Sequence, residues 1–355
     1  LRPENEIEII VDPETGVVQT IVGPKETRGD RDGDLDTARF GVLYDVVATE
    51  RGWIVADPES GKVKEIIFEE GQAGVNTIIS AAQTVGSLPL PSDRQQGQAP
   101  VALAYDRAHK HLYIADLNEH VIRRYDVETQ TLELIIGEVE VSGGQDGIGV
   151  EARLNQPFGL DFADDGLLYI ADAGNRAIRS FDPVTQEVRT VAQGEREPFD
   201  VLKHQNGNIY VVDGVTPALF KVEGNGFELV IGHLQEAGPG DGLDARFASP
   251  LSLTRHPQGG ILIADGENHR IRLVDLENSS VSTWVGQFTR HGGWGHRDPL
   301  PWEEIRLQSP NAVALSQTQA IVLSDTGVIL LEDSTLSSGE VSDEDNEENE
   351  QSGAE

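Results

Sequence analysis

The sequence predicts an all-β fold, a six-bladed β-propeller, and three observations support this prediction. A strand rich in β-branched residues and ending in Asp recurs six times along the chain, at Asp57, Asp116, Asp172, Asp213, Asp265 and Asp325. The gaps between these copies run from 41 to 60 residues, and a second strand with alternating polarity follows most of them. Self-similarity at this spacing, with several short strands and turns in each unit, is typical of propeller blades.

Each predicted blade starts with its innermost strand, which begins at a proline in most units: Pro100, Pro157, Pro198, Pro250 and Pro310. The second strand ends at the recurring Asp, and a third strand follows, most clearly at residues 118–125, 175–181 and 268–274. Because side chains alternate along a strand, these strands can fill the space between neighbouring blades. We interpret each recurring Asp as an acceptor of backbone N–H bonds in the turn that follows it, and not as a metal ligand.

The two ends of the chain are predicted to share the sixth blade. Residues 7–23 repeat the pattern of residues 178–194, in which Asp-Pro-x-Thr is followed by Val and Thr, so they resemble the outer half of a blade. The inner half would be residues 311–325. Residues 327–332 also read as a third strand, so the closure is either two strands plus two or three plus one. Both arrangements remove the open edges of an incomplete ring.

The propeller is predicted to span residues 1–333, and residues 334–355 form an acidic, Ser- and Glu-rich tail that we expect to be disordered. The net charge of −34 repels nucleic acid and anionic membranes and favours cationic partners. No apolar run approaches the roughly 18 residues that a membrane span needs. The sequence has no cysteine, which excludes disulfides and thiolate metal sites.

The chain starts at Leu1 and contains no methionine. We expect either that a targeting segment has been removed or that the chain belongs to a longer polypeptide or a larger complex. The absence of both sulfur-containing residues is consistent with an oxidising environment. We therefore predict an extracytoplasmic location, which means secreted, periplasmic or in an organelle lumen.

One full unit, made of residues 157–161, 168–172 and 175–179, resembles an NHL repeat. A second unit around Asp265 contains the Asn268-His269 pair for which these repeats are named. The resemblance covers residues 7–332 and implies a six-bladed propeller.

The spacers between blades contain a second recurring sequence motif, at residues 32–40, 146–154 and 241–247. It is similar to the spacers of NHL propellers fused to thioredoxin-like domains, which suggests a neighbouring domain. The spacer arginines are expected to pair with acidic or carbonyl groups of the adjoining blade: Arg39, Arg153 and Arg246. The residues that follow them are expected to fill the seam between blades: Phe40, Leu154 and Phe247.

The loop at residues 286–309 is locally basic and aromatic within a very acidic chain. It supplies six candidate binding residues: Arg290, His291, Trp294, His296, Arg297 and Trp302. Loops on rigid scaffolds often carry recognition, and Trp and Arg are favoured interface anchors. The alternative is that the loop folds over the channel and packs Trp294 inward.

The third residue of each innermost strand is expected to lie near the mouth of the central channel. Asp45 and Asp200 occupy this position in the first and fourth blades, which are opposite each other. They are candidate metal ligands that could hold calcium together with water or backbone carbonyls. The alternative is a pair of solvated carboxylates, and no other cofactor is predicted.

These features predict a non-catalytic recognition scaffold that binds a protein, peptide or glycan through the face bearing the inter-blade loops. The alternative is a calcium- or zinc-dependent propeller hydrolase or lyase with its site at the channel mouth, since related propellers include such enzymes. Zinc needs three or four convergent ligands, and the nine histidines lie away from the starts of the innermost strands. Some NHL propellers bind RNA with a basic face, but the acidic body argues against that partner.

Overall fold

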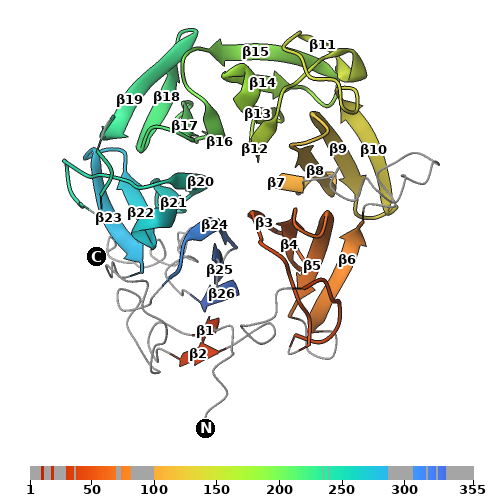
Figure 1. The fold of residues 1–355 in the computed structure, drawn as a ribbon, viewed down its shortest axis with the longest axis horizontal. Helices are drawn as coiled ribbons and strands as arrows, with labels where there is room; N and C mark the ends of the chain where they lie inside the picture. Colours follow the sequence, from red (N-terminus) through yellow and green to blue (C-terminus); the bar gives the residue numbers. More distant parts are fainter. Residues whose placement is uncertain are drawn as a thin grey trace, which may run out of the picture.

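The computed structural model describes residues 9–11, 17–19, 29–35, 37–68, 73–80, 100–234, 236–238, 240–286, 307–316, 319–324 and 327–332. These residues form six small sheets arranged around a central channel, which confirms the predicted six-bladed β-propeller (Figure 1). The described residues contain no helix with the length and apolar character needed to cross a membrane.

The first three blades are ordered from the channel outward along the chain. The first contains β3 (Asp45–Ala48), β4 (Gly52–Asp57), β5 (Lys62–Ile67) and β6 (Gly74–Ile79). The second contains β7 (Pro100–Asp106), β8 (His111–Asp116), β9 (Val121–Asp126) and β10 (Thr131–Ile136). The third contains β12 (Pro157–Phe162), β13 (Leu168–Asp172), β14 (Ala177–Phe181) and β15 (Glu187–Gln193), with β11 (Gly147–Ile148) added outside β15.

The remaining blades follow the same order. The fourth contains β16 (Pro198–Lys203), β17 (Ile209–Asp213), β18 (Ala218–Glu223) and β19 (Gly226–Gly232). The fifth contains β20 (Pro250–Arg255), β21 (Ile261–Asp265), β22 (Arg270–Asp275) and β23 (Ser280–Val285). The sixth contains β24 (Pro310–Leu315), β25 (Gln319–Ser324), β26 (Gly327–Glu332), β1 (Ile9–Val11) and β2 (Val17–Gln19). Three short 3-10 turns complete the elements: η1 (Gly149–Glu151), η2 (Ala173–Asn175) and η3 (Gly266–Asn268).

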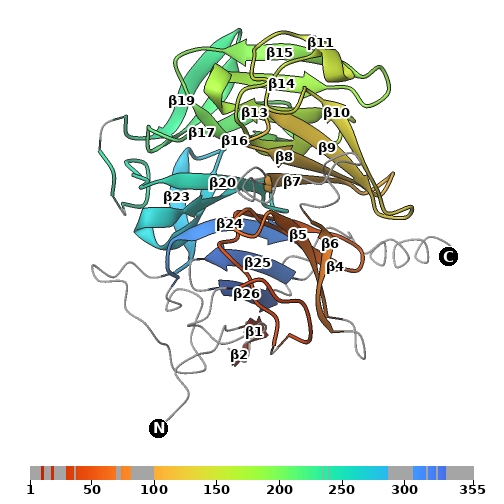
Figure 2. The ribbon, with the colours of Figure 1, turned by 45° about the vertical axis from the view of Figure 1, so that its right-hand side comes forward.

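The sixth blade joins the two ends of the chain, as predicted, but with a different division of strands. It has three C-terminal and two N-terminal strands, in place of two plus two or three plus one. The β25–β26 hairpin forms locally and covers the outer edge of β25, so β1 pairs with β26 instead. That pairing is parallel, with Ile10 opposite Leu331. Both views place β1 and β2 beyond β26, away from the channel (Figures 1 and 2).

The propeller has two distinct faces. The innermost strands begin on the face that also carries the spacers between blades, which we call the spacer face. They end on the opposite face, which carries the turns between the first and second strands and between the third and fourth; we call this the hairpin face. Asp126, Asp182 and Asp275 open three of these hairpin turns, and each accepts two backbone amides of its own turn.

The apolar core fills the seams between blades. One cluster joins Trp53 and Val55 of the first blade to Ala312 and Leu323 of the sixth, and all four side chains are buried. The spacer residues predicted to fill the seams are buried as well: Phe40, Leu154 and Phe247. Close packing between blades fixes the positions of the six innermost strands around the channel.

The recurring Asp side chains that the structure describes accept backbone amides, although not always from the predicted turn, and Asp325 lies outside the described residues. Asp213 accepts two amides of the turn that follows it, at 2.7 and 3.0 Å. Asp172 and Asp265 instead accept the amides of Asn155 (2.7 Å) and Ala248 (2.6 Å) in the spacer that precedes each blade. In the third and fifth blades the spacer passes beside the strand end, so its amides are the nearest donors.

The prediction for the spacer arginines is wrong for Arg153 and Arg246. Their side chains bind Glu138 and Glu236 of their own spacers, not the adjoining blade. The link to the blade comes from the spacer backbone, because the carbonyl of Arg153 accepts a hydrogen bond from the buried guanidinium of Arg179 (3.3 Å). A carbonyl is already fixed in place, whereas a long side chain must lose rotamer entropy to reach the same partner.

Candidate functional site

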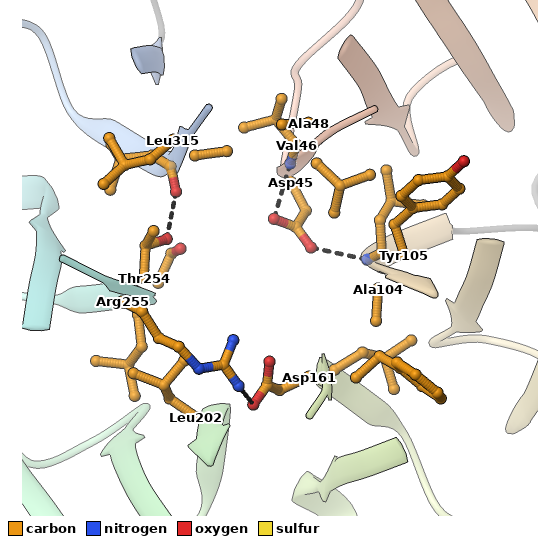
Figure 3. Close-up of a pocket in the computed structure, with 18 of the residues that line it drawn as sticks. Asp45, Val46, Ala48, Ala104, Tyr105, Asp161, Leu202, Thr254, Arg255 and Leu315 are labelled. Carbon is orange, nitrogen blue, oxygen red and sulfur yellow. Dashed lines mark hydrogen bonds and ion pairs between the residues drawn. The ribbon is translucent and has the colours of Figure 1, made fainter. Parts of the chain in front are cut away.

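The innermost strands of all six blades line a cavity of about 200 Å³ in the channel (Figure 3). Its lining runs from Asp45, Asp200 and Ser252 toward the strand ends on the hairpin face. Asp45, Asp161 and Arg255 point into the central opening (Figure 3). The cavity therefore concentrates charged groups that come from different blades.

Both predicted metal ligands, Asp45 and Asp200, line this cavity. The Asp45 carboxylate accepts the amide of the next residue and the amide of Leu103 in the second blade, each at 2.7 Å. Asp200 repeats this arrangement with the next residue at 2.8 Å and with Leu253 of the fifth blade at 2.7 Å. Each carboxylate thus bridges its own blade to the following one, and its orientation is fixed by two amides.

Burial dominates the electrostatics of these two acids. It raises the pKa of Asp45 to about 7, even though two amides favour the ionised form. Burial also raises the pKa of Asp200 well above its ordinary value, and the negative charge of Asp45 raises it further. The charge of Asp45 therefore acts on Asp200, and the backbone amides do not fully compensate the negative charge of the two carboxyl groups.

A third acid, Asp161, lies two residues further along its strand than the Asp45 and Asp200 positions. Its carboxylate binds the guanidinium of Arg255 and accepts the amide of Lys203 at 2.7 Å. Burial raises the pKa of Asp161, and the charge of Arg255 partly offsets that effect. Sequence reasoning missed this pair, although a charged residue in an otherwise apolar innermost strand was available as a signal.

Residues at equivalent register positions of the innermost strands form one layer of the channel. They are the first residue of β3 and the third residues of the other five strands: Asp45, Ala102, Gly159, Asp200, Ser252 and Ala312. Ser252 is 8% exposed, and its hydroxyl lines the cavity without a hydrogen bond to any residue that the structure describes. Gly159 leaves room for the backbone of Asp200, because a Cβ at that position would lie 2.5 Å from the Asp200 Cα. The layer therefore presents two carboxyl groups and one unpartnered hydroxyl.

An aromatic cluster, consisting of Tyr44, Phe158 and Phe199, lies on the spacer side of this layer. The rings of Phe158 and Phe199 stack with centroids 4.4 Å apart, and Tyr44 lies 6.3 Å from Phe158. Tyr44 precedes the first blade and Phe158 belongs to the third. The rings of these two residues therefore extend past the second blade toward the channel axis. Tyr44 is 40% exposed. The cluster gives the centre of the spacer face an accessible aromatic surface.

A second, larger pocket of about 640 Å³ lies on the hairpin face between the second and third blades. It shares Tyr105, Arg107 and Phe162 with the channel cavity, so the two spaces adjoin. Its outer wall includes Val184, which is 91% exposed. We call this space the side pocket.

The six candidate binding residues of the 286–309 loop, from Arg290 to Trp302, lie outside the described residues, as does the tail at 334–355. Binding by this loop stays a prediction. Among the described residues, no group of three or more His, Asp or Glu side chains is arranged to hold a metal ion. The calcium hypothesis for Asp45 and Asp200 likewise stays a prediction.

No family model matches the chain. Among curated proteins, it is 27% identical over 335 residues to "Protein SUPPRESSOR OF QUENCHING 1, chloroplastic" from Arabidopsis thaliana, which covers 75% of this chain and 31% of that protein. It is also 27% identical over 178 residues to "NHL repeat-containing protein 2" from Bos taurus, covering 47% of this chain and 23% of that protein. The chain thus spans less than a third of the length of these relatives.

Solved structures show the same fold at low sequence identity. A protein of unknown function from Bacteroides thetaiotaomicron has a TM-score of 0.68 at 20% identity, covering 87% of this chain and 73% of that one. An auxiliary nutrient binding protein from the same organism has a TM-score of 0.66 at 15% identity, covering 92% and 74%.

Propellers with other roles are similar as well. One chain of a nidogen/laminin complex has a TM-score of 0.54 at 14% identity (78% and 88% covered), and a gluconolactonase from Xanthomonas campestris has 0.54 at 13% (82% and 86%). These likenesses concern the fold alone. The six sheets around one channel make the chain a six-bladed β-propeller, and the recurring blade residues and the curated relatives support the NHL type of that fold.

Proposed function

We propose that this propeller is a recognition scaffold that docks a protein, peptide or glycan partner on its spacer face. The observation that carries the proposal is the aromatic cluster of Tyr44, Phe158 and Phe199 at the centre of that face. Exposed aromatic rings at the centre of a surface are typical anchors of an interface, because they bury a large area at little cost in rotamer entropy.

The surroundings of the cluster support the same role. Val215 lies in the turn after Asp213 on the same face and is 77% exposed. The loop with the six candidate residues runs between β23 and β24, whose facing ends also lie on the spacer face. The strongly acidic chain favours a partner that presents cationic groups.

The relatives are consistent with binding roles. The similar structures include a nutrient binding protein and a chain of a nidogen/laminin complex, and both are named for binding or assembly. We extend the binding role to this chain, together with an extracytoplasmic location.

A selection experiment tests the proposal. The purified propeller is screened on a glycan array and against a displayed peptide library, and the selected ligands are titrated by calorimetry. Tyr44→Ala should weaken their binding by roughly 30-fold, the effect of losing a hot-spot residue. Val184→Ser on the hairpin face is the matched control and should leave the affinity unchanged. Ligands that bind Tyr44→Ala normally but lose affinity for Val184→Ser would place recognition on the other face.

The enzyme alternative has one observation in its favour, which is the raised pKa of about 7 for Asp45 inside a cavity. Perturbed acids in clefts are candidates for catalytic groups. Hydrolysis of gluconolactone by the calcium-supplemented protein, abolished in Asp45→Asn, would support this alternative and would contradict a purely binding role.

A further inference from the structure

We propose that the channel cavity is a second binding site, which takes the primary ammonium group of a small organic cation entering from the hairpin face. This site is separate from the aromatic cluster proposed to dock a partner, because the cluster lies on the opposite side of the Asp45 and Asp200 layer. The cavity contains the charged groups shown in Figure 3.

The first argument is the charge balance of the cavity wall. The three acids of the wall come from three different blades: Asp45, Asp161 and Asp200. Of these three, only Asp161 binds Arg255. No positive side chain pairs with Asp45 or Asp200 among the described residues; their partners are neutral amides. Burial raises the pKa values of both acids, and the charge of Asp45 raises that of Asp200 further, which means that their negative charge is not fully compensated. A monovalent cation placed between them would relieve this deficit.

The second argument is the unpartnered hydroxyl of Ser252. This residue is 8% exposed, belongs to the same layer as the two acids and lines the cavity. Within the described part of the chain, the Ser252 oxygen is not among the fully buried polar atoms without a partner, so it is accessible from the cavity and can accept a hydrogen bond from a ligand there. A primary ammonium group has three N–H donors, and the layer offers three acceptor residues, the carboxyl groups of Asp45 and Asp200 and the hydroxyl of Ser252.

The third argument concerns the remainder of the ligand. Tyr105 and Phe162 line both the cavity and the side pocket, so an aromatic wall connects the two spaces. Aromatic faces attract cations and also pack against alkyl chains. Arg107 lines both spaces too, but its guanidinium is held by Glu50 (3.4 Å) and by the carbonyl of Ala48 (3.3 Å). The geometry therefore suits a ligand in which a primary amine is attached to an apolar group.

Calorimetric titration with defined probes tests this inference. n-Butylammonium is the test ligand, 1-butanol is its neutral counterpart, and calcium and glucose represent the metal and sugar alternatives. We expect n-butylammonium to bind at least tenfold more tightly than 1-butanol and to be unaffected by glucose. Equal binding of 1-butanol, or displacement of the ammonium by stoichiometric calcium, would overturn the proposal.

Variants locate the site. Asp200→Asn should weaken n-butylammonium binding at least tenfold and Ser252→Ala several-fold, while Tyr44→Ala should leave it unchanged. If Asp200→Asn fails to fold, as judged by circular dichroism, Asp45→Asn replaces it as the charge-removing variant. Full ammonium affinity in a folded Asp-to-Asn variant would contradict the inference. Because Tyr44→Ala affects the partner and not the amine, failure of either proposal can be recognised independently of the other.

Discussion

The guanidinium of Arg255 in the fifth blade binds the carboxylate of Asp161 in the third blade, across the inner strand of the fourth (Figure 3). Lys203 of the fourth blade takes part on both sides. Its amide donates to Asp161 at 2.7 Å, and its carbonyl accepts from the Nε of Arg255 at 2.9 Å. Three consecutive blades are therefore tied together at one point of the channel wall.

Arg255→Gln should destabilise the propeller, because it leaves the Asp161 carboxylate buried without its counterion. Removing one partner of a fully buried ion pair costs about 3–5 kcal/mol. Since the Arg255 side chain is 27% exposed, we expect a smaller loss, about 2 kcal/mol by the same reasoning. Urea-induced unfolding measures this change. The control is Arg107→Gln, whose side chain is 59% exposed and whose effect should stay below about 0.5 kcal/mol. Equal losses in both variants would contradict the role of the pair.

Gly159→Ala should destabilise the contact between the third and fourth blades. A Cβ at this position would lie 2.4 Å from the Asp200 Oδ1 and 2.6 Å from the Phe199 carbonyl oxygen, so backbone must shift. Overpacking of this kind costs roughly 1–3 kcal/mol. Gly226→Ala is the control, because no atom lies within 4 Å of its added Cβ. Thermal unfolding should separate the two variants, and a Gly159→Ala protein as stable as the wild type would show that the blades can move apart freely.

Asp45→Asn should become more stable relative to the wild type as the pH rises. The folded-state pKa of Asp45 is about 7, above the ordinary value of 3.8, so the folded protein binds more protons than the unfolded chain between these values. Its carboxyl group therefore contributes a loss of stability that grows from about pH 4 to about pH 7 and then levels off. The gain of the variant should reach roughly 2–4 kcal/mol at neutral pH. A difference in unfolding free energy that does not vary with pH would contradict the raised pKa.

Arg272→Met should be among the most damaging substitutions in the fifth blade. The Arg272 side chain is 0% exposed and binds Asp265 at 2.8 Å, and it also binds Asp241 of the spacer. Its loss leaves the fully buried Asp265 without a counterion, which costs about 3–5 kcal/mol. Arg189→Met is the control, since that side chain is 69% exposed and its ion pair should contribute less than about 1 kcal/mol. Denaturant midpoints that fall together would disprove the structural importance of the buried pair.

The blades were predictable because their second strands are buried on both faces. In β13 and β21 every residue is buried, so the sequence there is restricted to apolar, mostly branched residues and the terminal Asp. The division of the sixth blade was not predictable by the same reasoning. The parallel pairing of Ile10 with Leu331 joins distant segments with no turn between them, so no local pattern marks it.

The channel was predictable only in part. Aligning the innermost strands of the blades correctly brought Asp45 and Asp200 to one cavity, because strand register is regular even though β3 begins at Asp45 itself. The same alignment overlooked the pair of Asp161 and Arg255, which are 94 residues apart and lie on blades that are not neighbours. Periodicity describes one strand at a time, whereas this contact depends on how far a long side chain reaches across the ring.

The closure of the sixth blade also constrains how the protein is made. Along the chain β1 and β2 precede the other strands that the structure describes, yet β26, the partner of β1, comes more than 300 residues later. Contacts between such distant segments form slowly, because a long loop must close before they stabilise anything. The β1–β2 hairpin therefore lacks its sheet partner until β26 has been made, so we expect closure of the ring to follow the assembly of the other five blades.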